Sequence, residues 1–147
     1  MPLEKQSQVV VFSVPRTIEV VFHPEERAMV GHWHNLASEE MRSALERALQ
    51  ECERMQALCW IVDLTRNPGV PTQADLEWIV GPGAALARRA GVVAVLNVHG
   101  DSALARMGSR RWKGVSSEAL SVIDCSSLDE ALDLARHISL EAGHGEP

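Results

Sequence analysis

Polar residues cluster directly after one strongly apolar run of the sequence. Residues 58–64 read LCWIVDL, and Asp63, near the end of this run, is followed closely by Thr65, Arg66 and Asn67. A run of this kind predicts a central strand that is buried on both faces. Open α/β sheets bind ligands at the carboxyl ends of their strands, so these four residues form a candidate ligand or partner loop. The alternative is that Asp63 only initiates the turn that follows.

A hydroxyl group stands where the next helix is predicted to begin. Thr72 lies three residues before Asp75, which resembles the spacing of a capping box, and apolar residues continue the pattern. Free amides and the positive end of the helix dipole would also stabilise a phosphate at this point. Thr72 is therefore a candidate phosphoacceptor or helix cap, and capping alone is enough to explain it.

Two histidines, His32 and His34, lie two residues apart on a predicted strand, so we expect their rings on one face. Two imidazoles could begin a metal site, and His23 or His99 would be the further candidates. No third ligand lies at a diagnostic spacing. We therefore expect no metal, with His32 and His34 as weak candidates only.

A short basic segment, RMGSRRWK, lies late in the chain. Its candidate basic patch consists of Arg106, Arg110, Arg111, Trp112 and Lys113. Such a patch could dock an acidic partner or a phosphate. The alternative is a solvated loop in an otherwise acidic protein.

Motifs of common catalytic sites are missing from the sequence. It has no GxSxG elbow, no Walker loop, no GxGxxG after a strand, no HExxH and no tyrosine. Cys52, Cys59 and Cys125 lack CxxC spacing and are typical of buried thiols in a reducing compartment. We therefore expect a non-enzymatic protein that uses no cofactor.

Length and charge narrow the class further. A chain of 147 residues fits one domain, which we place at residues 1–147. The net charge of −6 argues against a nucleic-acid partner, which requires a positive surface. No secretory signal and no apolar stretch of membrane-spanning length occurs, so we expect a soluble, cytoplasmic protein.

The apolar periodicity changes along the chain from strand-like to helix-like. The pattern predicts a β-meander over about residues 8–34 and alternating helices and strands over about residues 38–142. The helices are expected at residues 38–55, 72–90, 101–107 and 127–138, and the later strands at residues 58–64, 92–98 and 120–125. Gly81-Pro82-Gly83 should interrupt or kink the second of these helices. This order predicts an α/β fold with a mixed sheet of five to six strands and about four helices.

The order of these elements and several local segments resemble the STAS superfamily, in particular small bacterial SpoIIAA-like proteins. The segments are HWHNLASEEMRSAL, LCWIVDLTRNPGVPTQADLEWI, GVVAVL and SSLDEALDLA, within residues 33–138. The resemblance implies helices mainly on one face of the sheet and a regulatory, signalling role through docking of a protein partner. The chain is also similar in outline to CRAL-TRIO lipid-binding domains, which implies a small apolar or lipid-like ligand as the alternative.

The resemblance also bears on Thr72. In anti-sigma-factor antagonists a strand ending in Asp-Leu-Ser precedes an Asp-Ser-Ser-Gly sequence, in which a partner kinase phosphorylates one serine. Here the strand ends in Asp63, Leu64 and Thr65, and Thr72 lies near the phosphoacceptor position. The Asp-Ser-Ser-Gly sequence itself is absent, with Pro71 at the position of its aspartate.

Core packing should separate the two functions, since a filled core favours docking and a lined cavity favours a ligand. We expect Leu45, Leu49 and Ile61 to lie in one core. Residues 58–62 and 92–96 are apolar on both strand faces, and we expect four helices of modest length to leave part of the sheet uncovered. An open apolar face predicts a contact surface, and the commonest closed assembly is a two-fold homodimer.

Overall fold

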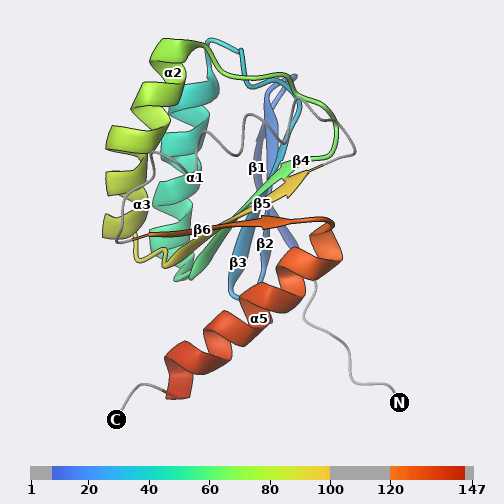
Figure 1. Ribbon diagram of the computed structural model, residues 1–147, viewed down its shortest axis with the longest axis vertical. Helices are drawn as coiled ribbons and strands as arrows, with labels where there is room; N and C mark the ends of the chain where they lie inside the picture. Colours follow the sequence, from blue (N-terminus) through green and yellow to red (C-terminus); the bar gives the residue numbers. More distant parts are fainter. Residues whose placement is uncertain (1–7, 100–119, 145–147) are drawn as a thin grey trace.

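The computed structural model describes residues 8–99 and 120–144. These residues form one six-stranded sheet whose strands lie side by side in chain order (Figure 1). β1, β2 and β3 are antiparallel, and β3 to β6 are parallel. The strands are β1 (Val9–Val14), β2 (Ile18–His23), β3 (Ala28–Trp33), β4 (Cys59–Leu64), β5 (Ala94–His99) and β6 (Ser121–Cys125).

Two tight turns produce the antiparallel part of the sheet. The Thr17 amide donates to the Val14 carbonyl, with Arg16 at φ 63° between β1 and β2. The Arg27 amide donates to the Pro24 carbonyl, with Arg27 itself at φ 50°. Both turns need one residue in the left-handed region, and they place the predicted meander where the sequence expects it.

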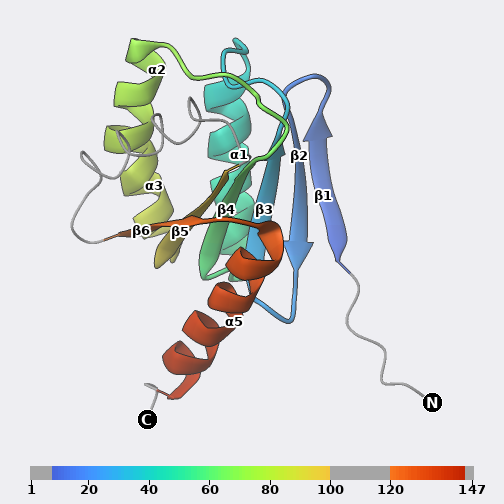
Figure 2. The same cartoon turned by 45° about the vertical axis from the view of Figure 1, so that its right-hand side comes forward.

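Helices cover both faces of the sheet. α1 (Met41–Met55) lies beside a broken helix that comprises α2 (Gln73–Trp78), the π-helical turn η1 (Ile79–Gly83) and α3 (Ala84–Arg89). α5 (Leu128–His144) crosses the opposite face, as Figure 2 shows from a second direction. With α2, η1 and α3 counted as one helix, the described residues contain three helices, two of them on one face. The fourth predicted helix, residues 101–107, lies outside the described residues.

The apolar stripe of α1 is confirmed, but its start is not at Ser38. The helix begins at Met41, with Glu40 as an N-cap that makes no side-chain capping bond. Ser38 Oγ instead accepts from the Glu40 amide at 3.1 Å and from Thr17 Oγ1 at 2.9 Å. Ser38 therefore stabilises a turn that joins the helix entry to β2, because a serine side chain can bond its own local backbone as readily as cap a helix.

The sheet separates two apolar cores, because successive side chains of a strand point to opposite faces. Trp60 and Val62 of β4 face α1, with Leu45 and Leu49 in the same cluster. Ile61 faces α5 in the other cluster, together with Ala131 and Ala135. The prediction that Leu45, Leu49 and Ile61 share one core is therefore wrong for Ile61.

α5 also changes the expected exposure of the sheet. It contacts β3, β4, β5 and β6, and Ser139 Oγ donates to the Glu26 carbonyl at 2.9 Å. The second apolar face of the parallel strands is thus covered within the chain, so it is not the open face on which a homodimer was predicted. None of the described helices has the length and apolar character required to cross a membrane.

Candidate functional site

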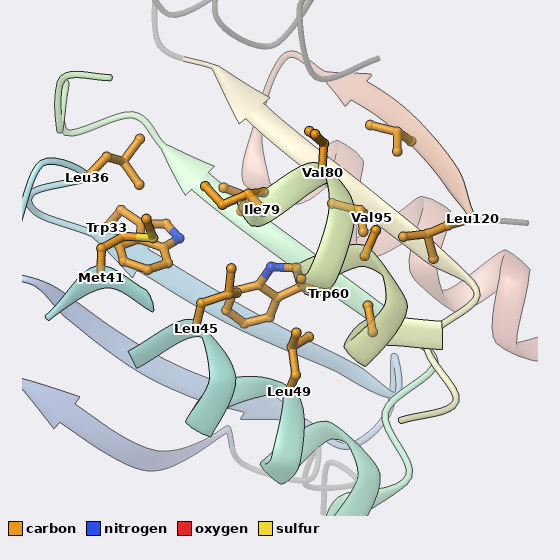
Figure 3. A pocket seen from close by; sticks show the side chains of 15 residues that line it. Trp33, Leu36, Met41, Leu45, Leu49, Trp60, Ile79, Val80, Val95 and Leu120 are labelled. Carbon is orange, nitrogen blue, oxygen red and sulfur yellow. The ribbon is translucent and has the colours of Figure 1, made fainter. Parts of the chain in front are cut away.

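An apolar cavity lies between the sheet and the two helices on its first face. Its volume is about 60 Å³, and it is partly open to solvent. Figure 3 shows Trp60 on the sheet between Leu45 and Leu49 of α1 on one side and Val80 on the other. All its lining side chains are apolar: Trp33, Leu36, Met41, Leu45, Leu49, Trp60, Val62, Ile79, Val80, Ala84, Ala87, Val95, Leu120 and Val122, with Gly83.

The floor of the cavity depends on a glycine. A Cβ at Gly31 would lie 2.5 Å from Cη2 of Trp60 and 2.9 Å from Cδ1 of Ile18, so the indole ring lies directly over Gly31. In the register of β4 and β5, Trp60 pairs with Val95. The absence of a side chain at Gly31 therefore allows the indole ring of Trp60 to pack against β3.

The helical wall is built by the interruption that the sequence predicts at Gly81-Pro82-Gly83. The chain does not break there but passes through η1, which contains Pro82 and then continues as α3. Proline lacks an amide hydrogen, so a π-helical turn accommodates it. Ile79, Val80 and Gly83 of this turn all line the cavity.

Arg42 holds the two helices of this layer together. Its Nε lies 2.6 Å from Asp75 Oδ1, and its guanidinium lies 5.8 Å from the centre of the Trp78 ring. The Asp75 carboxylate thus pairs with Arg42 of α1, and among the described residues no hydrogen bond from the Thr72 amide to this carboxylate completes a capping box. The contact fixes the start of α2 against α1, above the apolar cavity.

Three polar residues follow the cavity residues along β5 and β6 on the same face. Asn97 is fully buried and pairs in register with Asp124, and His99 is 9% exposed. His99 Nε2 lies 3.1 Å from Asp124 Oδ1. His99 Nδ1 is fully buried, and in the part of the chain that the structure describes no hydrogen-bond partner reaches it.

The opposite face carries a second polar group at the carboxyl ends of β3 and β4. Asp63 Oδ2 lies 2.6 Å from His32 Nδ1, while Asp63 Oδ1 accepts from the amide and the hydroxyl of Thr65 at 2.9 and 2.7 Å. Burial raises the pKa of Asp63, but these hydrogen bonds lower it, and the resulting pKa lies below the ordinary value. Asp63 therefore has both of the roles that the sequence left open, because Oδ1 stabilises the turn and Oδ2 orients the imidazole of His32.

The remaining loop residues lie near this group without joining it. Arg66 Nη1 lies 3.3 Å from His34 Nε2, on the exposed side of the loop. Asn67 takes the left-handed conformation with φ 53°, and its amide donates to the Leu64 carbonyl. Of the four predicted loop residues, the structure thus brings Asp63 and Thr65 together, whereas Arg66 contacts His34 and Asn67 forms the turn.

Thr72 is the N-cap of α2. Its Oγ1 accepts from the Asp75 amide at 3.1 Å, and its side chain is exposed. This contact accounts for the residue as a cap, while its role as a phosphoacceptor stays a prediction. The predicted basic patch of Arg106, Arg110, Arg111, Trp112 and Lys113 lies outside the described residues.

His32 and His34 do not converge, since one bonds Asp63 and the other lies against Arg66. Within residues 8–99 and 120–144, no three histidine, cysteine, aspartate or glutamate side chains are placed to hold a metal ion.

The three cysteines are buried free thiols. Burial raises the pKa of Cys52 and of Cys59 to about 12 and that of Cys125 to about 11. Since the thiolate is the reactive form, these side chains act as small apolar groups of the core.

Sequence reasoning missed the cavity and the His99–Asp124 pair. The sequence pattern indicates His99 only as a further metal ligand and gives no role to Asp124. The available signal was a polar residue at alternate positions of a buried run, since Asn97 and His99 follow Val95 on one face of β5. The cavity gave no such signal, because its walls come from five separate segments of the chain.

No protein-family model matches the chain, and no curated protein is significantly similar to it.

Proposed function

We propose that the chain is a non-enzymatic binding module that holds a small apolar ligand between its sheet and its helices. The cavity lined by Trp33, Trp60, α1 and η1 carries this proposal. Concave, mostly apolar sites between layers are where proteins commonly bind small molecules. A lined cavity is also the feature that favours a ligand over docking alone.

The size of the cavity limits the ligand. An engineered apolar cavity of about 150 Å³ stays dry and binds benzene or xenon. The cavity here, at about 60 Å³, is smaller but partly open, so a narrow alkyl chain that protrudes at one end fits better than a ring. Met41 lies in the wall, and its flexible side chain can adapt to a slightly larger guest.

Titration with n-pentane, followed by NMR of the methyl groups, tests this proposal. Saturable shifts are expected at Leu45, Leu49 and Val95. Ala87 is buried in the cavity wall, so Ala87→Leu should abolish these shifts by filling the space. Arg88→Leu, at the exposed neighbouring position, is the matched control and should bind like the wild type. Unsaturable shifts, or equal shifts in Ala87→Leu, would reject the cavity as the site.

A protein-interaction role of SpoIIAA-like type is the second candidate function. It is supported by the exposed segment that follows β4, in which Arg66 and Thr72 are exposed and Val70 is 47% exposed. Thr72→Glu should then alter recovery of a protein partner without unfolding the domain, while Thr72→Ala should not mimic it. Equal recovery from both variants and the wild type would leave Thr72 as a cap only.

We also propose that the protein is cytoplasmic and forms a homodimer. Three buried free thiols fit a reducing, cytoplasmic compartment. The antiparallel edge offers a place for a homodimer, since β2 is the one described strand that pairs with β1, and Val9 and Val10 of β1 are 45% and 59% exposed. Two such edges can pair about a two-fold axis and continue the sheet.

A further inference from the structure

The buried ring nitrogen Nδ1 of His99 has no hydrogen-bond partner among the residues that the structure describes. Buried polar atoms are almost always hydrogen-bonded, so an exception calls for a missing partner. His99 Nδ1 is such an exception among the described residues. The imidazole itself is held in place, because Nε2 bonds Asp124 Oδ1 at 3.1 Å.

The register places His99 on the same face of the sheet as the cavity, although His99 does not line it. Val62 pairs with Asn97, and Leu64 pairs with His99, on the face that also carries the cavity residue Val95. Strand geometry puts the Cα of His99 roughly 8 Å from that of Val62, which lines the cavity. A ligand whose hydrocarbon part fills the cavity would therefore have to extend past Val62 along this face to reach the imidazole.

The contact with Asp124 determines what His99 can recognise. An ionised carboxylate only accepts hydrogen bonds, so Nε2 must carry the hydrogen that is donated to Asp124. In the neutral imidazole, Nδ1 then holds a lone pair and accepts. The matching group on a ligand is a hydroxyl that donates.

We propose that the ligand is a small apolar alcohol, whose hydrocarbon part fills the cavity and whose hydroxyl donates to His99 Nδ1. This inference rests on the proposed function and adds the chemical class of the ligand. It also explains why an apolar cavity is followed along β5 by a buried histidine that another side chain orients.

Two probes of equal size, 1-butanol and n-pentane, separate the hydroxyl from the hydrocarbon. The ratio of their affinities is measured by NMR titration for the wild type, for His99→Phe and for His137→Phe. His137 is a matched control, with its side chain 67% exposed on α5. The loss of one hydrogen bond predicts that His99→Phe lowers the preference for 1-butanol by up to about tenfold, with no change in His137→Phe.

A second readout needs no variant. The ¹⁵N shift of His99 Nδ1 in the wild type should move with 1-butanol and stay unchanged with n-pentane. An unmoved Nδ1 shift, or an equal preference in wild type and His99→Phe, would mean that this nitrogen holds only a water and would overturn the proposal. Tighter binding of butyrate than of 1-butanol would overturn it as well, because the imidazole would then be donating.

The two proposals fail in different ways. If n-pentane does not bind the wild type, the cavity is not a ligand site and both proposals fall. If n-pentane binds and 1-butanol gains nothing from His99, the binding function stands and the assignment of an alcohol is wrong.

Discussion

At the scale of single residues, Asp63 shows how one side chain combines two roles. Its two oxygens bond Thr65 and His32, and the side chain is only 7% exposed. The sequence predicted Asp63 as either a turn former or a site residue, since both roles use a carboxylate after a strand. The pairing with His32 could not be predicted, because it depends on the parallel register of β3 and β4.

Asp63→Asn tests this group. Asparagine has one accepting oxygen and cannot accept from both His32 and Thr65, so we expect a loss of about 1–3 kcal/mol in unfolding free energy at pH 7. The pKa of Asp63 is lower in the folded protein than in the unfolded chain. Its contribution to stability is therefore fully present at pH values above the pKa of the unfolded chain, and it disappears as the pH falls through the pKa of the folded protein. Urea unfolding of both proteins at neutral and acidic pH measures the difference.

Asp133→Asn is the control for that experiment, because the Asp133 side chain is 72% exposed. It should leave the unfolding free energy within about 0.5 kcal/mol at every pH. A destabilisation by Asp63→Asn that does not shrink toward acidic pH would contradict the role assigned to the ionised carboxylate.

At the scale of elements, local patterns predicted what each segment is but not where its ends and partners lie. The three- and four-residue spacing of α1 and the apolar run of β4 were sufficient for a helix and a buried strand. The start of α1 was misplaced, because Ser38 bonds Thr17, which is distant in the sequence. The interruption at Pro82 was foreseen, but only the tertiary contacts turn it into a π-helical wall instead of a break.

Leu49→Ala tests the packing of α1 on the sheet. Leu49 is 3% exposed and lines the cavity, so its truncation should cost about 2–5 kcal/mol and enlarge the space. Gln50→Ala, on the exposed side of the same helix, should change the unfolding free energy by less than about 0.5 kcal/mol. Denaturant unfolding measures both, and a cost below about 1 kcal/mol for Leu49→Ala would mean that α1 does not pack as described.

At the scale of the whole molecule, the layer arrangement determines which surfaces remain open. The sequence predicted a mixed sheet with helices mainly on one face, and the structure has that arrangement. It did not indicate that α5 would cover the other face, since an amphipathic helix does not specify which sheet face it covers. Among the described residues, the strands with one paired neighbour are the edge strands β1 and β6, and β1 is the edge at which we propose a homodimer in place of the face of the parallel strands.

Val10→Lys tests the proposed homodimer at this edge. A lysine on an edge strand opposes pairing with a second sheet, so the variant should sediment as a monomer while the wild type shows about twice the 16.1 kDa chain mass. Gln50→Lys, at an exposed position of α1, should not change the assembly. A wild-type species of 16.1 kDa at micromolar concentration, without concentration dependence, would exclude the dimer.

The most direct measurement of the binding function is a crystal structure of the protein under xenon pressure. Xenon enters apolar cavities and is visible as a strong isolated peak. The predicted result is one peak enclosed by Leu45, Trp60 and Val95, which is lost in Ala87→Leu and retained in Arg88→Leu. Absence of xenon between the sheet and the helices, or an equal peak in Ala87→Leu, would contradict a ligand site in this cavity.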